Sequence, residues 1–288
     1  MNHISNILEY PFASTPDPGE TIEVAPGVHW LRMPLPMSLN HINLYLIEGD
    51  QDWTIVDTGI RGEETSELWK QIFADRLGDK PVGQIICTHM HPDHTGQAGF
   101  LSDYWRAPLL MSYSEYYQAR VMGSMMQEGG SWHMSDFFIR AGVTMETLEA
   151  MRDMRSSFTP SADDTPLPKS YLRLSEGDTL KIGANEWEII VGTGHSPEHV
   201  CLYCKELRVF ISGDQILPVI TSNVSVHPTE PLANPLLGWL DSHLKLMALI
   251  PDDTLILPAH NEPFYGVRLR LQQLIEHHQE RMQIVLDQ

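Results

Sequence analysis

The chain has 288 residues, of which 42% are hydrophobic and 20% charged, and its formal net charge is −19. This length is enough to bury a sizeable core, as one large domain or two small ones. The acidic balance repels nucleic-acid phosphates and anionic membranes, and no apolar run approaches the ~20 residues that cross a bilayer, so we expect neither partner. Three cysteines are too few for a disulfide framework, and the N-terminus does not read as a secretory signal, which favours the cytoplasm.

Residues 1–21 are rich in Pro, Ser and Thr and are expected to form a loosely structured lead-in. Short apolar stretches bounded by turn residues then predict strands. Those of the first half lie at 22–24, 28–33, 42–49, 52–59, 84–88 and 107–112. Apolar residues at helical spacing predict a helix near 62–77, and another begins at Gly96.

Residues 112–157 favour helix and are rich in methionine, and prolines end this segment near residue 168. The predicted strands that follow it lie at 178–182, 186–194, 199–204, 207–214 and 254–260. Two further helices are expected at 235–249 and 266–285. Strand-rich halves that each end in helices fit a sheet-on-sheet core with helices outside, in the α+β class. We therefore expect one domain over 22–288, with 112–168 as a helical insertion.

The stretch ICTHMHPDHTG contains His89, His91, Asp93 and His94 directly after an apolar strand. Histidines two residues apart in a loop that leaves a strand can point their rings at one ion, while the adjacent Asp-His pair can face a second ion. Imidazole and carboxylate together suit zinc, manganese or iron. The sequence therefore predicts a metal site in this loop.

Three more candidate ligands each follow an apolar strand elsewhere in the chain: His195 in VGTGHSPEHV, Asp214 in VFISGDQILP and His260 in LILPAHNEP. Loops at strand ends are where a rigid scaffold gathers catalytic groups. Four such loops that all carry His or Asp are hard to explain by chance, although His195 or His260 alone would be ambiguous.

This set of motifs resembles the metallo-β-lactamase superfamily of hydrolases. The similarity is carried by HxHxDH at 89–94, the GHSPEH histidine, the SGD aspartate, the PAH histidine and DTG at 57–59. It runs from about residue 22 to the C-terminus, interrupted by the helical insertion. It implies an αββα sandwich with the metals at one edge.

The resemblance also implies two divalent ions, with zinc expected first and iron or manganese as alternatives. One ion would be held by His89, His91 and His195, and the other by Asp93, His94 and His260, with Asp214 bridging both. Asp57 is expected to support the ligands without binding metal. Two close cations make hydroxide from a shared water, and Asp93 is the candidate for proton transfer to the leaving group. No GxSxG nucleophile motif is present.

Several residues differ from the motifs of known subgroups of the superfamily, and these differences narrow the range of expected substrates. Asp214 disfavours true β-lactamases, and Leu217 replaces the tyrosine of the acyl-homoserine lactonases. The Gly-Cys-Gly that usually follows the bridging aspartate of glyoxalase II enzymes is also missing. A general hydrolase of a small-molecule acyl ester, thioester or lactone remains, similar to the glyoxalase II-like and lactonase-like branches. The alternatives are a mononuclear iron oxygenase of the persulfide dioxygenase kind and a non-catalytic metal-containing protein that binds a ligand.

The methionine-rich insertion bears on the partners. Met122, Met125 and Met126, with Trp132 and a Phe-Phe pair at 137–138, could surround an apolar part of the substrate. The competing interpretations are a separate helical core and a contact that forms a homodimer. Arg268 and Arg270 are interpreted as a solvated helix face, and His277–His278 as surface residues.

Overall fold

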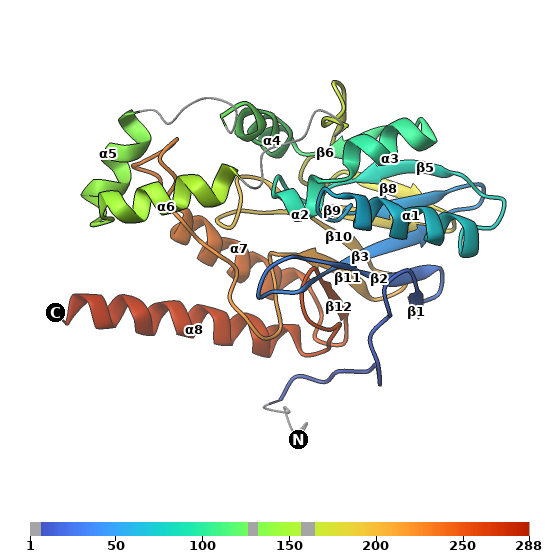
Figure 1. The fold of residues 1–288 in the computed structure, drawn as a ribbon. Helices are drawn as coiled ribbons and strands as arrows, with labels where there is room; N and C mark the ends of the chain where they lie inside the picture. Colours follow the sequence, from blue (N-terminus) through green and yellow to red (C-terminus); the bar gives the residue numbers. More distant parts are fainter. Residues whose placement is uncertain (1–6, 126–131, 157–164, 288) are drawn as a thin grey trace, which may run out of the picture.

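The computed structural model describes residues 7–125, 132–156 and 165–287, in which two β-sheets pack face to face (Figure 1). The strands of the first sheet follow chain order: β1 (Thr21–Ala25), β2 (Val28–Pro34), β3 (His41–Glu48), β4 (Trp53–Val56), β5 (Val82–Ile86), β6 (Leu109–Met111) and β7 (Leu172–Arg173). The second sheet has the order β12-β11-β10-β9-β8. Its strands are β8 (Thr179–Ile182), β9 (Asn185–Gly192), β10 (His199–Cys204), β11 (Val209–Gly213) and β12 (Leu255–Pro258).

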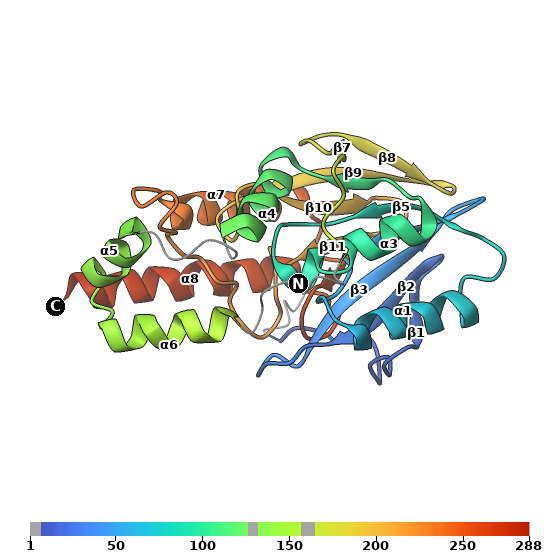
Figure 2. The same cartoon turned by 45° about the horizontal axis from the view of Figure 1, so that its top comes forward.

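Three apolar clusters build the layers. Between the sheets, Trp30, Trp187 and their neighbours are fully buried. Outside the first sheet pack α1 (Glu63–Asp75) and α3 (Ala98–Trp105), and outside the second pack α7 (Pro235–Leu249) and α8 (Val267–Leu286), as Figure 2 shows. The expected αββα sandwich is confirmed.

The predicted helical segment forms α4 (Tyr113–Met125), α5 (Trp132–Arg140) and α6 (Met145–Ser156). In Figure 1, α5 and α6 stand to one side of the sandwich, away from the sheets. No described residue of α5 is buried, and Trp132 is 70% exposed, so α5 does not form a separate core of its own. Met126 lies outside the described residues, and the domain boundaries stay predictions.

The strand directions explain how distant motifs meet. Strands β4 to β7 run parallel, so their carboxyl ends open at one edge of the first sheet. Asp57 follows β4, and the histidine-rich loop follows β5. In the second sheet, β11 and β12 are also parallel and lead to Asp214 and His260. Among the described helices, none combines the length and the apolar character needed to cross a bilayer.

Candidate metal centre

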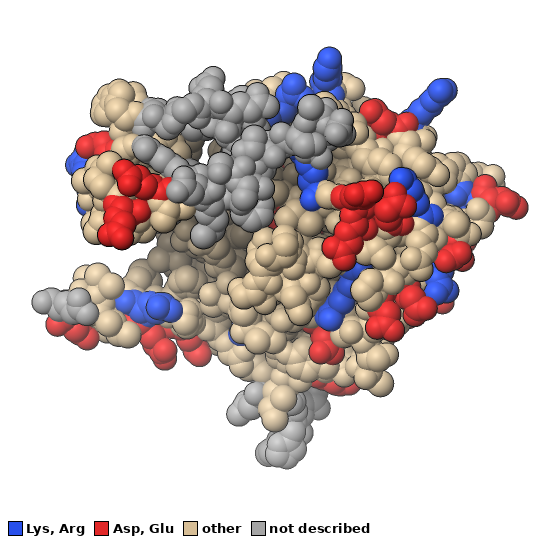
Figure 3. Space-filling model, in the orientation of Figure 1, with Lys and Arg blue, Asp and Glu red and all other residues tan. Residues whose placement is uncertain are grey.

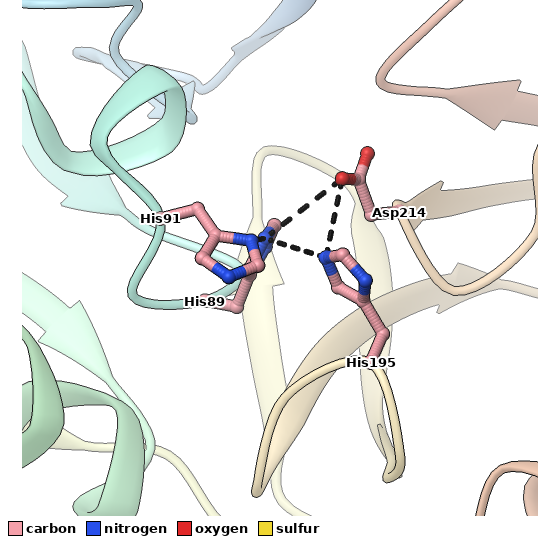
Figure 4. Close-up of side chains that lie close together, drawn as sticks. All are labelled: His89, His91, His195 and Asp214. Atoms are coloured by element: carbon pink, nitrogen blue, oxygen red, sulfur yellow. Dashed lines mark hydrogen bonds and ion pairs between the residues drawn. The ribbon is translucent and has the colours of Figure 1, made fainter. Parts of the chain in front are cut away.

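Four of the predicted ligands form a first group, which we call cluster A: His89, His91, His195 and Asp214. His89 Nε2 lies 2.9 Å from His91 Nδ1 and 3.1 Å from His195 Nε2. Asp214 Oδ2 lies 3.2 Å from His195 Nε2 and 3.9 Å from His89 Nε2. Figure 4 shows the four side chains pointing at one another from three separate loops. Cluster A therefore combines residues that follow strands of both sheets.

The other three predicted ligands, Asp93, His94 and His260, form a second group, cluster B. Asp93 Oδ2 lies 3.6 Å from His94 Nε2 and 3.5 Å from His260 Nε2. Asp214 Oδ1 approaches this group as well, at 3.8 Å from His94 Nε2 and 3.4 Å from His260 Nε2. The two oxygens of the Asp214 carboxylate therefore face different clusters.

The donor set fits metal ions. Ligand bonds of about 2.0–2.1 Å in a tetrahedral site place neighbouring donor atoms about 3.3 Å apart, close to the separations observed here. His94 Nε2 and Asp214 Oδ1 are buried, and neither has a hydrogen-bond partner. Such unpaired buried polar atoms are costly unless something binds them. Imidazole and carboxylate donors suit divalent zinc, iron or manganese.

Asp57 supports cluster B from behind, as the sequence suggested. Its Oδ2 accepts a 2.8 Å hydrogen bond from His94 Nδ1, which leaves Nε2 for the metal side. Its other oxygen accepts from the backbone N–H of Thr88 at 2.8 Å. Asp57 has a φ of 63°, in the left-handed region that Asp tolerates better than most residues. The backbone turn after β4 thus aims this carboxylate at the histidine loop.

Backbone carbonyls orient two further candidate ligands, His195 and His260. His195 Nδ1 donates to Asn223 O at 2.8 Å, and His260 Nδ1 donates to His41 O at 2.9 Å. A partner on the second ring nitrogen selects the tautomer whose Nε2 is free to bind metal. Asn223, in the loop after Asp214, therefore contributes through its backbone carbonyl.

The clusters differ in electrostatics. Burial and the nearby His195 lower the pKa of His91 to about 3, and burial with His94 and His91 nearby lowers the pKa of His89 well below its usual value. Burial also opposes the charge on His94, but the carboxylates around it outweigh burial and raise its pKa to about 10. Asp57 is the largest of these favourable charges.

Glu115 on α4 is a buried carboxylate that sequence reasoning missed. Its Oε2 accepts from the backbone N–H of Met90 at 2.9 Å, and its Oε1 accepts from that of Glu198 at 2.7 Å. Glu198 in turn accepts from the backbone N–H of Ser114 at 2.7 Å. Burial raises the pKa of Glu115. The start of the helical segment is thereby bonded to both histidine loops, although nothing in the local sequence marks Glu115.

His199, in the motif that contains His195, also lies at the centre although it was given no role. Its ring stacks on His89 with centroids 4.7 Å apart, and its Nε2 accepts from the Asp214 backbone N–H at 3.1 Å. The hydrogen bond holds the backbone of Asp214 in place. The second histidine of GHSPEH was the available signal.

Two interpretations of α8 hold only in part. Arg270 is 8% exposed, and it donates to Leu217 O at 2.6 Å and to Ile220 O at 2.8 Å. It is therefore a buried anchor for the loop after Asp214, whereas Arg268 is exposed. His278 is half-buried, with its ring 4.7 Å from that of Trp239. Arg270 and His278 are less exposed than expected because the loop after Asp214 and α7 cover a polar face of the helix.

Comparison with known proteins agrees with the geometry. A family model described as the Metallo-beta-lactamase superfamily matches residues 38–260. The chain is 25% identical over 262 residues to a probable metallo-hydrolase, YqjP, of Bacillus subtilis, covering 88% of this chain and 78% of that protein. It is 22% identical over 249 residues to the acyl-coenzyme A thioesterase MBLAC2 of Gallus gallus, covering 84% and 80%.

Among solved structures, a beta-lactamase domain protein from Burkholderia ambifaria is similar over most of the chain. It superposes with a TM-score of 0.87 at 44% identity, covering 96% of this chain and 80% of that one. The likeness extends beyond the residues that the family model matches.

Proposed function

Because the chain belongs to the metallo-beta-lactamase superfamily, we propose that it is a dinuclear metallo-hydrolase of a small-molecule acyl ester, thioester or lactone. The observation that carries this proposal is the carboxylate of Asp214, with one oxygen toward cluster A and the other toward cluster B. A single carboxylate placed in this way suits a pair of ions that share a water. The thioesterase named among the relatives supports a thioester within the proposed set.

The seven side chains of the two clusters would hold two divalent cations, with zinc expected first. When bound, such a pair lowers the pKa of a shared water and polarises the attacked carbonyl. The protein supplies the rest: buried rings fixed by their second nitrogens, and one bridging carboxylate fixed through its own backbone N–H. This rigidity removes the cost of reorganising the site during the reaction.

Asp93 is the proposed proton carrier. Its side chain is 20% exposed, more than that of Asp214 at 10%, so it lies on the accessible side of the centre. Burial opposes its charge, but His94 and His260 lower its pKa, so it is a carboxylate at neutral pH. It can accept the proton of the attacking water and return it to the leaving thiolate or alkoxide.

The loop after Asp214 favours a substrate with an apolar part. Asn223 O binds His195, and Ser222 Oγ donates to Asp214 O, so this loop borders the centre directly. Val219 is 63% exposed and Val226 is 39% exposed on the same loop. Exposed aliphatic side chains beside a polar centre offer an acyl chain contact at little desolvation cost.

The test is metal content by mass spectrometry on protein purified without chelator, paired with a panel of thioesters, lactones, aryl esters and phosphodiesters. Two ions per chain and turnover of an acyl substrate are expected. One iron with oxygen consumption would instead indicate the oxygenase. Two ions without turnover on any substrate would indicate a binding protein, and either result would overturn the proposal.

A further inference from the structure

A group of aromatic and basic side chains lies on α4 and around β7, outside the two metal clusters. The rings of Tyr113 and Tyr117 are 4.8 Å apart, and these residues are 50% and 48% exposed. Tyr116 stacks on Tyr171 with centroids 3.9 Å apart at 17°. We call this group the tyrosine–arginine patch, and its members are Tyr113, Tyr116, Tyr117, Arg120, Tyr171 and Arg173.

The patch carries the opposite charge to the protein as a whole. The guanidinium carbon of Arg173 lies 5.2 Å from the ring centroid of Tyr113, and that of Arg120 lies 5.6 Å from the Tyr116 centroid. Over residues 113–122 and 165–174 every exposed charge is basic, including Lys169, because the carboxylate of Glu115 is buried. In Figure 3, basic side chains stand at the upper edge of the molecule, above α4 and β6. With a net charge of −19, such a local excess of cations favours an anion.

The topology places this patch at the same sheet edge as the metal centre. Tyr113 comes two residues after the end of β6, and Arg173 is the last residue of β7. Both strands run parallel to β5, whose carboxyl end leads to His89. Adjacent strands are about 4.8 Å apart, so the end of β7 lies about 10 Å along this edge from the end of β5. Glu115, bonded to Met90, ties the same helix to the histidine loop.

The chemistry of the patch suits a phosphorylated nucleotide. Exposed tyrosine rings stack with planar bases, and guanidinium groups bind phosphate oxygens through paired N–H donors. We propose that the patch binds the phosphorylated adenosine of a coenzyme A thioester, while the pantetheine arm carries the acyl group to the metal centre. The coenzyme A part rests on the proposed hydrolase function, whereas nucleotide binding at the patch does not.

Titration calorimetry with adenosine 3′,5′-bisphosphate tests the binding site alone. We expect Arg173→Ala to weaken binding by about tenfold or more, since it removes charge-assisted hydrogen bonds to the phosphate. Arg173→Lys keeps the charge without the planar fork and should weaken binding less. Arg281→Ala, on the exposed end of α8, is the matched control and should bind normally. Absence of binding to the unmodified protein, or equal affinity in Arg173→Ala, would overturn the site.

Kinetics then separate the coenzyme from a free nucleotide. The unmodified protein should show a lower KM for an acyl-coenzyme A than for the same acyl group on N-acetylcysteamine, which lacks the nucleotide. Arg173→Ala should raise KM only for the coenzyme A substrate and leave kcat close to normal. Bisphosphate binding combined with equal KM values for both thioesters would overturn the coenzyme A proposal. If no acyl substrate were cleaved, the proposed function would fail while the calorimetric result stood on its own.

Arg173 also packs on Tyr113, so Arg173→Ala could weaken nucleotide binding by destabilising the fold. Thermal melting curves test this. A lower melting temperature of Arg173→Ala with unchanged nucleotide affinity would show that the patch stabilises the fold, and would overturn the proposal. Unchanged melting with weakened affinity supports it.

Discussion

Asp214 faces both cluster A and cluster B, yet the rest of the protein supports the two clusters in different ways. In cluster B, His94 is backed by the carboxylate of Asp57 and has a pKa raised to about 10. In cluster A, His195 is backed by a neutral carbonyl, and the pKa of His91 is lowered to about 3. Free cluster A therefore presents His91 as a neutral imidazole, whereas free cluster B holds a proton on His94 at neutral pH.

The two clusters therefore differ in whether a metal ion must displace a proton in order to bind. A metal ion entering cluster B must displace a proton, and His260, whose pKa is also raised despite burial, adds to that requirement. A metal ion entering cluster A meets no such competition from His89 or His91. We therefore expect the metal affinities of the two clusters to depend differently on pH.

Replacing Asp214, which faces both clusters, should weaken metal binding at both of them. Asp214→Ala removes an oxygen from each cluster, so both occupancies should fall. Turnover should drop by on the order of 1,000-fold or more, since cation stabilisation of the transition state amounts to several kcal/mol. Metal content and kcat on the best substrate of the panel measure this. Activity equal to that of the unmodified protein would contradict the bridging role.

Lowering the pH should weaken metal binding at cluster B more than at cluster A. His94, with a pKa of about 10, is protonated below that value, so metal affinity at cluster B should fall about tenfold per pH unit for this one proton. His91, with a pKa of about 3, stays neutral over the same range. Between pH 8 and pH 6, chelator competition should show one ion lost well before the other. Parallel loss of both ions would contradict the comparison.

Removing the negative charge of Asp57 behind cluster B should make the pH dependence of metal binding at the two clusters more alike. Asp57→Asn keeps the shape and tolerates the left-handed backbone, so the fold should be retained. Metal affinity at cluster B should fall roughly 10–100-fold, as is usual when such an outer partner is lost. The loss of its largest favourable charge also lowers the pKa of His94, so the pH dependence of cluster B should flatten. A purely structural role for Asp57 would leave that slope unchanged.

The smallest effect is expected at Glu115, which supports the loops of cluster A. Glu115→Gln leaves one backbone N–H, that of Met90 or Glu198, facing an amide donor. We expect the free energy of unfolding to fall by about 1–3 kcal/mol, the cost of an unsatisfied buried donor. Metal affinity should weaken at cluster A more than at cluster B. Glu149→Gln on the exposed face of α6 should change neither quantity in urea unfolding and chelator competition.

Local patterns in the sequence were sufficient to predict every described strand except the two-residue β7, most of the helices and the seven candidate ligands. Alternating and continuous apolar runs reflect burial on one or both strand faces, so they can be read without neighbours. The histidine-rich loop after β5 was visible because its four candidate ligands fall within six consecutive residues. The remaining three candidates needed the family resemblance to be joined to it.

Only the tertiary structure decided which groups support those ligands. Asp57 meets His94 across 37 positions, and Glu115 meets Glu198 across 83, so no periodic pattern could reveal either pair. Arg270 looked solvated because its helix face is polar, yet the loop after Asp214 folds over it. Partners that lie far apart along the chain are selected by packing of the two sheets, which is a property of the whole fold and not of any one segment.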